Sequence, residues 1–478
     1  MTESILRWFR AINRIPRGSK NEKAISDWLA AWAGEHGFAS RRDAVLNLVI
    51  EVPGTPGLEG APTVVVQGHM DMVCEKAKGS RHDFTTDPIE PIIDGDWMRA
   101  DNTTLGADNG IALAMAMTVA TARNVPHPPL ELLFTVDEET GLTGANALEN
   151  GFIRGKILLN LDSEDEGVFT VGCAGGRDTH LHLPLQTAAP SPDHSPFKIT
   201  VGGLRGGHSG IDIQRQRGNA VRILGRALDQ VLARCDARLV SIQGGSAHNA
   251  IPRDAEAVVM LPAGEVDRVG PVIGALERSL RAELARVDPG ISLSLEAVTE
   301  SPAGPAWSAQ TTRTAVDLLL AIPHGVAALS TEIAGLVETS NNLATVVTAN
   351  GEMVVQTSQR SSIMQCLDFL THRIESVGRL AGAKARSNTG YPSWQPNMAS
   401  PLLAQCKRLY RELFDKDPVV EIIHAGLECG IIGSKYEGMD MISFGPTIVD
   451  PHSPNERIEI SSIGKVWDFF TALLARLK

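Results

Sequence analysis

The stretch Val64-Val65-Val66-Gln67-Gly68-His69-Met70-Asp71 decides how this chain is interpreted. A run of β-branched residues is typical of a buried strand. Because side chains alternate along an extended chain, His69 and Asp71 fall on the same side of it. One ring nitrogen of His69 can then bind a metal ion while Asp71 holds the other nitrogen. The stretch therefore predicts a buried strand with a metal ligand at its carboxyl end.

Later segments place acidic residues at comparable positions. They are Gly106-Ala107-Asp108-Asn109-Gly110, Val136-Asp137-Glu138-Glu139 and Leu161-Asp162. A further segment, Pro451-His452-Ser453-Pro454-Asn455-Glu456, adds a histidine near the carboxyl end. Each segment alone is typical of a polar turn or an acidic surface loop. Together they indicate a hydrolase with two metal ions, because acidic and histidine residues would otherwise follow several apolar strands by coincidence.

The residue types suit a pair of divalent cations. Two such ions about 3.5–4 Å apart need a bridging carboxylate, terminal ligands and a shared water. The candidate ligands are two histidines and three carboxylates, namely His69, His452, Asp108, Glu139 and Asp162. Nitrogen and oxygen donors favour zinc, and cobalt or manganese would also fit. Glu138 is a carboxylate in excess of this set, and it is free to act as general base because adjacent side chains point in different directions.

Composition limits the function classes. A chain of 478 residues is expected to form two domains. Hydrophobic residues make up 43% and charged residues 21%, which is typical of a soluble globular protein. The net charge of −12, with no basic block, argues against a nucleic-acid partner.

Two further features bear on the compartment. No apolar run of about 18 residues occurs, so no membrane span is expected, and residues 1–16 show no apolar signal core. The six cysteines include no C-x-x-C pair, which disfavours a thiolate zinc site and is typical of reduced thiols. We therefore expect a cytoplasmic protein.

The order of predicted elements indicates one domain inserted in another. Up to residue 186, strands and helices alternate and polar residues gather at strand ends, as in an α/β sheet. The stretch 188–193, rich in Ala, Pro and Ser, is typical of a linker. We predict a catalytic domain of residues 1–186 and 381–478, interrupted by an α+β domain of residues 187–380.

Apolar periodicity predicts the individual elements. In the catalytic domain it predicts helices at 4–15, 21–36, 110–123, 400–414 and 461–477, and strands at 44–51, 63–70, 130–136, 156–161, 419–423 and 441–444. In the insertion it predicts helices at 218–234, 266–286 and 311–320, and strands at 197–201, 239–243, 255–261, 291–297, 343–349 and 352–359. His180 and His182 have chelating spacing, but we interpret them as part of a polar strand near the junction.

Five motifs together resemble a known metallopeptidase family. They are His69-Met-Asp71, Gly106-Ala-Asp108-Asn-Gly110, Asp137-Glu138-Glu139-Thr-Gly141, Leu159-Asn-Leu-Asp162-Ser-Glu164 and Pro451-His452-Ser-Pro-Asn-Glu456. The family comprises aminoacylases, carboxypeptidases and dipeptidases with co-catalytic zinc. Within it the chain is similar to the aminoacyl-histidine (Xaa-His) dipeptidases of the peptidase D type, through segments such as Ile15-Pro16-Arg17-Gly-Ser19, Gly203-Leu-Arg-Gly-Gly-His208-Ser-Gly210 and His424-Ala-Gly-Leu-Glu-Cys-Gly430.

The resemblance spans nearly the whole chain and implies its fold class. That class is α/β, with a mixed-sheet, dinuclear-metal aminopeptidase-like catalytic domain and an inserted α+β lid domain. It also implies two divalent metal ions, most simply zinc. For the assembly it leaves two alternatives: a homodimer formed through the lid, or an enlarged lid that replaces the partner subunit, so that His208 acts either in its own chain or in a partner's site.

The resemblance further implies a role for each catalytic-domain residue. His69 and Asp162 would hold one metal ion, and Glu139 and His452 the other. Asp108 would bridge the two ions and be followed by a cis peptide bond. Asp71 would orient His69, and Glu138 would be the general base.

Four lid residues are matched to the family's pattern. His208 corresponds to a histidine that stabilises the oxyanion, and Asn249 and Arg360 to residues that contact the carboxyl-terminal end of the substrate. Gly426 would border the substrate pocket. The segment 356–360 departs from the wider family's usual residues around the arginine. From the residues alone, Asn249 and Arg360 are equally consistent with a turn or surface role, whereas the glycine-rich surroundings of His208 favour a functional role.

The expected function is hydrolysis of short peptides, Xaa-His dipeptides such as β-alanyl-histidine in particular. Two alternatives lie within the same family, namely an N-acyl-amino-acid deacylase and a dipeptidase of broad specificity. A more distant alternative is a non-enzymatic binding protein that contains metal. The spare carboxylate Glu138 argues against it, because a structural metal site needs no general base.

Overall fold

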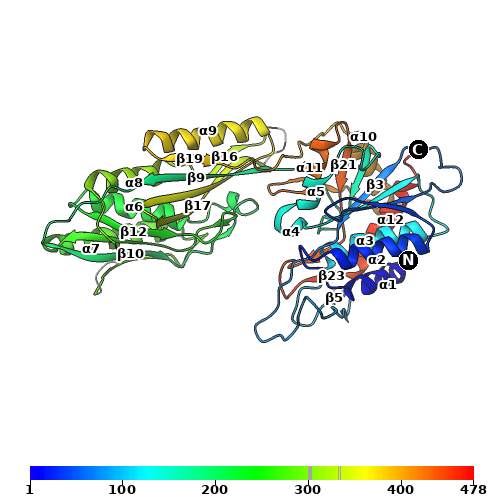
Figure 1. The fold of residues 1–478 in the computed structure, drawn as a ribbon, viewed down its shortest axis with the longest axis horizontal. Coiled ribbons are helices and arrows are strands. Elements are labelled where there is room, and N and C mark those ends of the chain that lie inside the picture. Colours follow the sequence, from blue (N-terminus) through cyan, green and yellow to red (C-terminus); the bar gives the residue numbers. More distant parts are fainter. Residues whose placement is uncertain (300–303, 332, 334) are drawn as a thin grey trace. The chain divides into compact units, whose positions relative to one another are not determined.

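The computed structural model describes residues 1–299, 304–331, 333 and 335–478, and these form two compact units (Figure 1). Unit 1 comprises Met1–Cys173, Trp394–Ile423 and Leu427–Lys478. Unit 2 comprises Ala174–Ser393 and His424–Gly426. The predicted insertion, 187–380, lies within unit 2. Segments on both sides of it also belong to that unit, because strands on each side pair in its sheet.

Unit 1 contains an eight-stranded mixed sheet with the strand order β1-β2-β6-β3-β7-β21-β8-β20. Its strands are β1 (Ala39–Arg42), β2 (Leu48–Val52), β3 (Val64–His69), β6 (Leu130–Thr135), β7 (Ile157–Asn160), β8 (Val168–Cys173), β20 (Val419–Ile423) and β21 (Asp440–Ser443). A second, four-stranded sheet holds β4 (Ile92–Asp94), β5 (Trp97–Arg99), β22 (Ile448–Val449) and β23 (Arg457–Glu459).

The strands at the centre of the large sheet run parallel. β3 pairs in parallel with β6 on one side and with β7 on the other, and β7 pairs in parallel with β21. All six residues of β3 are buried, as its β-branched sequence predicts. The carboxyl ends of these four strands therefore meet at one edge of the sheet, which is where ligands bind in open α/β sheets.

Helices cover this sheet and fix the loops at its edge. They are α1 (Thr2–Asn13), α2 (Lys23–Glu35), α3 (Ala107–Thr121), α4 (Glu138–Gly141), α5 (Thr143–Ala147), α10 (Pro401–Phe414), α11 (Glu428–Lys435) and α12 (Ile460–Leu474). The Ala- and Met-rich helix α3 is buried along almost its whole length and packs against β3 and α1. Its small side chains permit that close approach.

Gly68 is the point of closest approach between β3 and α3. A Cβ atom at this position would lie 2.4 Å from Asn109 Oδ1 and 2.9 Å from Ala112 Cβ. We expect Gly68→Ala to destabilise the protein by about 1–3 kcal/mol, because overpacking forces neighbouring groups to shift. Urea unfolding followed by circular dichroism measures the effect. The control is Gly34→Ala in α2, where an added Cβ meets nothing within 4 Å and the helix gains stability. Equal stability of Gly68→Ala and the parent would contradict this packing.

Unit 2 is built on a nine-stranded sheet in the order β15-β10-β14-β12-β17-β18-β9-β19, with β16 beside β17. Its strands are β9 (Gly175–Pro184), β10 (His194–Gly202), β12 (Arg238–Gly244), β14 (Ala255–Pro262), β15 (Ser292–Ala297), β16 (Gly325–Leu329), β17 (Val337–Ala349), β18 (Glu352–Ser361) and β19 (Lys384–Ser387). A separate short pair joins β11 (Gly207–His208) to β13 (Ala250–Ile251).

Four helices pack on the sheet of unit 2 (Figure 1). They are α6 (Ala220–Leu232), α7 (Val266–Glu283), α8 (Ala309–Ala321) and α9 (Met364–Leu380), and the 3₁₀ turns η1 (Ile213–Arg215) and η2 (Ala263–Glu265) join other elements. α6 contacts β10, β14 and β17, whereas α9 lies along β9 and β19. The apolar faces of these helices and of the sheet form one buried core.

Two predicted elements differ from the structure in their bounds, and several elements were not predicted. The predicted strand 44–51 is interrupted, because the Asp43 side chain accepts hydrogen bonds from the backbone N–H groups of Val45 and Asn47 and closes a turn between β1 and β2. The predicted helix 110–123 begins at Ala107 and so includes the candidate ligand Asp108. Helix α9 was not predicted. The α/β fold class with a second α+β unit is confirmed.

None of the described helices combines the length and the apolar character that crossing a membrane requires.

Candidate metal centre

The predicted catalytic residues of unit 1 gather at the carboxyl edge of its parallel strands. His69 is the last residue of β3, and Asp162 follows β7 by two positions. Glu138 and Glu139 begin α4, three and four residues beyond β6. The other two candidates do not follow a strand of the large sheet. Asp108 lies in the first turn of α3, and His452 lies in the turn after β22.

Two groups of donor atoms share Asp108. In the first, His69 Nε2 lies 3.1 Å from Asp108 Oδ1 and 3.4 Å from Asp162 Oδ1. In the second, His452 Nε2 lies 3.0 Å from Asp108 Oδ2 and 3.1 Å from Glu139 Oε2. Within each group all donor atoms lie within 4.8 Å of one another. Asp108 thus turns one carboxylate oxygen toward each group, as a bridging ligand must.

Asp71 lies behind His69, on the side away from the donor groups. Its Oδ1 is 3.2 Å from His69 Nδ1, which leaves Nε2 as the ligand nitrogen. The carboxylate also accepts hydrogen bonds from Ser19 Oγ and from the backbone N–H groups of Glu138 and Glu139. Burial alone would raise the pKa of Asp71, but the contact with His69 outweighs this effect and lowers the pKa to about 2. Asp71 therefore connects the ring of His69 to the start of α4.

Glu138 stands beside both groups. One of its carboxylate oxygens lies within 4.8 Å of donor atoms of His69 and Glu139. Burial raises the pKa of Glu138 well above its usual value, and the nearby acids Asp162 and Glu139 act in the same direction. The preceding residue, Asp137, has a left-handed backbone with a φ of 50°. This conformation is uncommon outside glycine.

The donor set fits two divalent cations. Each group offers one imidazole nitrogen and two carboxylate oxygens, which are ligands that zinc accepts. Buried Glu139 Oε1 has no hydrogen-bond partner among the described residues. Hydrogen bonds with Asp108 and Glu139 raise the pKa of His452 to about 11, because the two carboxylates stabilise its protonated form. The peptide bond between Asp108 and Asn109 is cis, as the resemblance implied.

Three charged residues of this region were not predicted as site residues. Burial raises the pKa of Glu164 to about 8, and Asp108 and Asp162 contribute to the shift. Arg17 and Glu456 are almost wholly buried next to the turn that carries Asp108. All three lie in the sequence motifs that suggested the family, but nothing in those motifs says what the side chains contact.

In unit 2, the neutral form of His208 is held with a defined tautomer. Its Nδ1 accepts hydrogen bonds from the backbone N–H groups of Gly210 and Ile211, so the ring proton lies on Nε2. Burial and the positive charge of Arg360 lower the pKa of His208 to about 4. His208 is therefore a neutral hydrogen-bond donor at neutral pH.

The other predicted residues of unit 2 are linked through two that were missed. Ser209 donates its backbone N–H to the carbonyl oxygen of Asn249, and its hydroxyl lies 3.5 Å from Arg360 Nη2. Arg360 also donates from Nη1 to the hydroxyl of Tyr391 at 2.7 Å. A Cβ atom on Gly426 would come within 2.7 Å of the ring of Tyr391. The Asn249 side chain itself is exposed.

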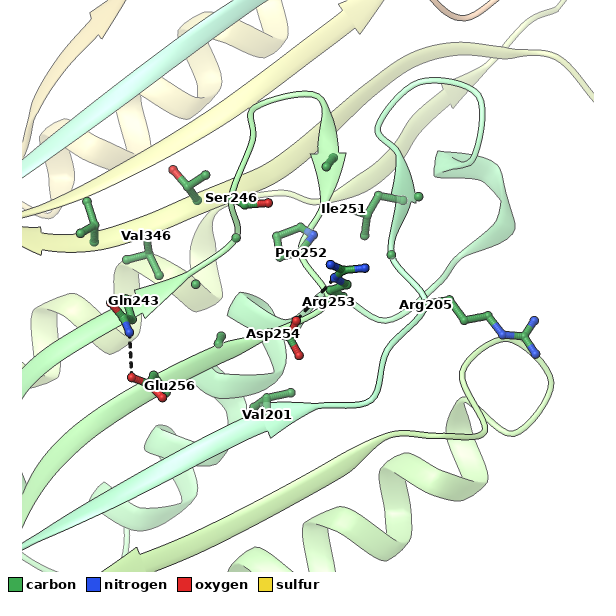
Figure 2. Close-up of a pocket in the computed structure, with 18 of the residues that line it drawn as sticks. Val201, Arg205, Gln243, Ser246, Ile251, Pro252, Arg253, Asp254, Glu256 and Val346 are labelled. Atoms are coloured by element: carbon green, nitrogen blue, oxygen red, sulfur yellow. Dashed lines mark hydrogen bonds and ion pairs between the residues drawn. The ribbon is translucent and has the colours of Figure 1, made fainter. Parts of the chain in front are cut away.

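Unit 2 also contains an open cavity of about 980 Å³ (Figure 2). Residues 200–201, 205–208, 243–246, 249–256 and 345–347 contribute to its walls, among them His208 and Asn249. Figure 2 shows the ion pair between Arg253 and Asp254 that lines it. None of the described residues that line this cavity belongs to a cluster of potential metal ligands. The clusters found among the described residues all lie in unit 1.

Known proteins are similar to the chain over almost its full length. Residues 65–476 match the model of peptidase family M20/M25/M40. The chain is 41% identical over 469 residues to the cytosol non-specific dipeptidase of Escherichia coli (strain K12), covering 98% of this chain and 96% of the relative. Its structure is similar to that of aminoacylhistidine dipeptidase from Vibrio alginolyticus, with a TM-score of 0.89 and 40% identity over 98% of this chain and 96% of the other. Aminopeptidase PepT from Bacillus cereus has the same fold, with a TM-score of 0.57 and 17% identity over 100% and 99% of the two chains.

Proposed function

The chain belongs to peptidase family M20/M25/M40, and on this premise we propose that it hydrolyses dipeptides whose carboxyl-terminal residue is histidine, such as β-alanyl-histidine. Membership confirms the predicted metallopeptidase resemblance and the prediction of a metal-dependent peptidase. The relative from V. alginolyticus, which is named an aminoacylhistidine dipeptidase, supports the narrower substrate. The observation that carries the proposal is the pair of donor groups that share Asp108, with Glu138 beside them.

The proposed ligands follow from the two donor groups. His69 and Asp162 would hold one divalent cation and Glu139 and His452 the other, and Asp108, which belongs to both donor groups, would be shared by the two. Bound cations supply Lewis acidity and lower the pKa of water, and zinc is the cation we propose. Asp71 keeps the ring of His69 in place from the opposite side.

Glu138 performs the proton transfers in the proposed reaction. Its carboxylate accepts a proton from the attacking water while the water oxygen forms a bond to the scissile carbonyl carbon. When the C–N bond breaks, the same carboxyl group gives that proton to the leaving nitrogen. Burial raises the pKa of Glu138 above its usual value, and this makes its carboxylate a stronger base for the first step than an exposed glutamate.

Unit 2 contributes the groups that contact the rest of the substrate. We assign the Nε2–H of His208 to the carbonyl oxygen of the scissile bond, which becomes negatively charged. Arg360 and Asn249 contact the substrate carboxylate, and Gly426 borders the pocket. The buried, positively charged Arg360, connected through Ser209 to Asn249, supports the assignment of the carboxylate.

His208→Ala is expected to lower kcat by about 10²–10³-fold with little change in KM or metal content, because a donor that acts on the oxyanion is needed only in the transition state. Steady-state kinetics and elemental analysis measure the two effects. His372→Ala, on the exposed face of α9, is the matched control and keeps the parent's kcat. An unchanged kcat in His208→Ala would make His208 a loop residue only.

A dipeptidase of broad specificity is the second candidate function, and the name of the E. coli relative, a non-specific dipeptidase, favours it. A panel of substrates separates the candidates, with Xaa-His dipeptides, dipeptides ending in other residues, and N-acyl-amino acids assayed at equal concentration. We expect kcat/KM to be highest for Xaa-His dipeptides. Equal values across all dipeptides would establish the broader function, and preference for acylated amino acids would identify a deacylase.

The same relative supports a cytosolic location, which we propose for this chain.

A homodimer formed through unit 2 stays a prediction, and light scattering on the purified protein tests it.

A further inference from the structure

Four consecutive backbone N–H groups leading into α3 converge on one buried carboxylate. Glu456 accepts hydrogen bonds at Oε2 from Leu105 and Gly106, at 2.6 and 3.0 Å, and at Oε1 from Ala107 and Asp108, at 2.7 and 3.3 Å. Only 2% of Glu456 is exposed. Burying a carboxylate costs free energy because it loses its hydration, and several hydrogen-bond donors are needed to compensate for that loss. The backbone of the residues up to Asp108 is thus fixed from one side.

A buried arginine fixes the same turn from the other side. Arg17, which is 1% exposed, donates to the carbonyl oxygen of Gly106 at 2.5 Å. Its second terminal nitrogen donates to the carbonyl oxygens of Met70 and Asp71 at 3.1 and 2.9 Å. The guanidinium therefore joins the segment after His69 to the segment before Asp108. Its positive charge also offsets the buried negative charge of Glu456.

Two glycines leave the space that Arg17 occupies. A Cβ atom on Gly106 would lie 2.5 Å from Arg17 Nη2, and one on Gly110 would lie 2.6 Å from the same atom. Gly106 also has a left-handed backbone with a φ of 70°. The glycines on both sides of Asp108 in the motif 106–110 are therefore explained by the arginine beneath it.

We propose that Arg17 and Glu456 are positioning residues that together set the direction of the two carboxylate oxygens of Asp108 and so the affinity for the metal pair. Glu456 lies four residues after His452, so its four hydrogen bonds connect the loop of one ligand to the turn of another. Arg17 connects that turn to the loop after His69. The inference rests on the ligand set proposed above, and neither side chain contacts a metal ion.

The test compares two buried glutamates that accept backbone hydrogen bonds. Glu456→Gln replaces one acceptor oxygen by an amide donor, so two of the four N–H groups lose their partner. Glu131→Gln is the matched control. Glu131, 1% exposed, accepts hydrogen bonds from the backbone N–H groups of Arg154 and Gly155 at 2.7 and 3.0 Å but supports no ligand. Both variants of the full chain are stripped of metal, melted, and titrated with Co²⁺ while its visible absorption is recorded.

We expect both variants to melt earlier than the parent, but only Glu456→Gln to bind Co²⁺ about 10–100-fold more weakly and with an altered visible spectrum. Arg17→Lys is the second variant. Lysine keeps the positive charge but cannot reach all three carbonyl oxygens, so we expect this variant also to bind Co²⁺ more weakly. If Glu456→Gln does not fold, Arg17→Lys alone tests the proposal. The proposal would be overturned if Glu456→Gln and Arg17→Lys folded and bound Co²⁺ with the parent's affinity. They would then resemble the control Glu131→Gln, which differs from the parent only in its lower melting temperature.

His452→Ala distinguishes failure of this inference from failure of the proposed function. Weaker binding of one of the two Co²⁺ ions in His452→Ala, with parental binding of both in Glu456→Gln and Arg17→Lys, would refute the positioning role alone. Parental binding in His452→Ala would refute the ligand set and both proposals with it.

Discussion

Replacing Glu138 by glutamine is expected to reduce kcat by about 10²–10⁴-fold while both metal ions stay bound. Glutamine has nearly the same shape but cannot accept a proton, so the attacking water keeps its proton and the leaving nitrogen receives none. The ligand set is unaffected, because Glu138 is the carboxylate that the two groups sharing Asp108 do not use. Steady-state kinetics with β-alanyl-histidine, together with elemental analysis of the same sample, measures both quantities.

The control for this variant is Glu149→Gln, an exposed glutamate of the same unit, which should keep the parent's kcat and metal content. Two results would contradict the role of Glu138. If Glu138→Gln retained turnover within a few-fold of the parent, another group would have to move the proton. If it lost a metal ion, Glu138 would be a ligand, and the group formed by His69, Glu138 and Glu139 would replace one of the proposed pair.

The metal centre was predictable where the signal is local. Strand alternation alone puts His69 and Asp71 on one side of β3, and the structure brings their side chains to 3.2 Å. The carboxyl ends of parallel strands meet at one edge, so apolar runs followed by acidic residues indicate that Glu139 and Asp162 converge. His452 follows no long strand, and the motif resemblance rather than periodicity placed it with them.

The supporting contacts were not predictable, because they join residues far apart in the chain through backbone atoms. Arg17 binds carbonyl oxygens next to His69 and Asp108, and Glu456 binds amide groups about 350 positions earlier. Any residue type supplies such backbone groups, so no side-chain pattern reveals the pairing. In unit 2 the contact of Arg360 with Tyr391 depends on Gly176, which pairs with Arg360 between β9 and β18 and forms a bridge to Tyr391, and no local signal sets either pairing.

The secondary structure shows the same limit. The predicted strand at 44–51 was interrupted by a turn that depends on one side chain, Asp43. Helix α9 was missed although its buried residues, such as Leu367, Leu370 and Ile374, recur at helical spacing. Helix α3 was placed three residues late, because its first turn contains the candidate ligand Asp108 and has a non-helical backbone at Asp108 and Asn109. Local preference is overridden there by the contacts of the metal centre.

Asp108→Asn is expected to have the largest effect on metal content. Among the described residues, only Asp108 contributes donor atoms to both the group with His69 and Asp162 and the group with Glu139 and His452. Asparagine offers one carbonyl oxygen and one amide donor, so at most one ion keeps this ligand, and the negative charge between the two ions is lost. We expect metal affinity to fall more than about 100-fold, beyond the effect of substitutions that act only through supporting residues, and kcat to fall with it. Titration of the metal-free protein with Zn²⁺, followed by calorimetry, measures the affinity and the number of ions bound.

His452→Ala provides the contrast that makes this result specific to a bridging role. Because His452 belongs to one group only, its removal should weaken the binding of one ion and leave the other near its parental affinity. Asp108→Asn should instead weaken both. If the two variants gave the same titration, with one ion lost and one unchanged, Asp108 would be a terminal ligand of a single ion. The opposed 3.1 and 3.0 Å contacts of its two oxygens would then reflect hydrogen bonding to the two imidazoles and not a shared carboxylate.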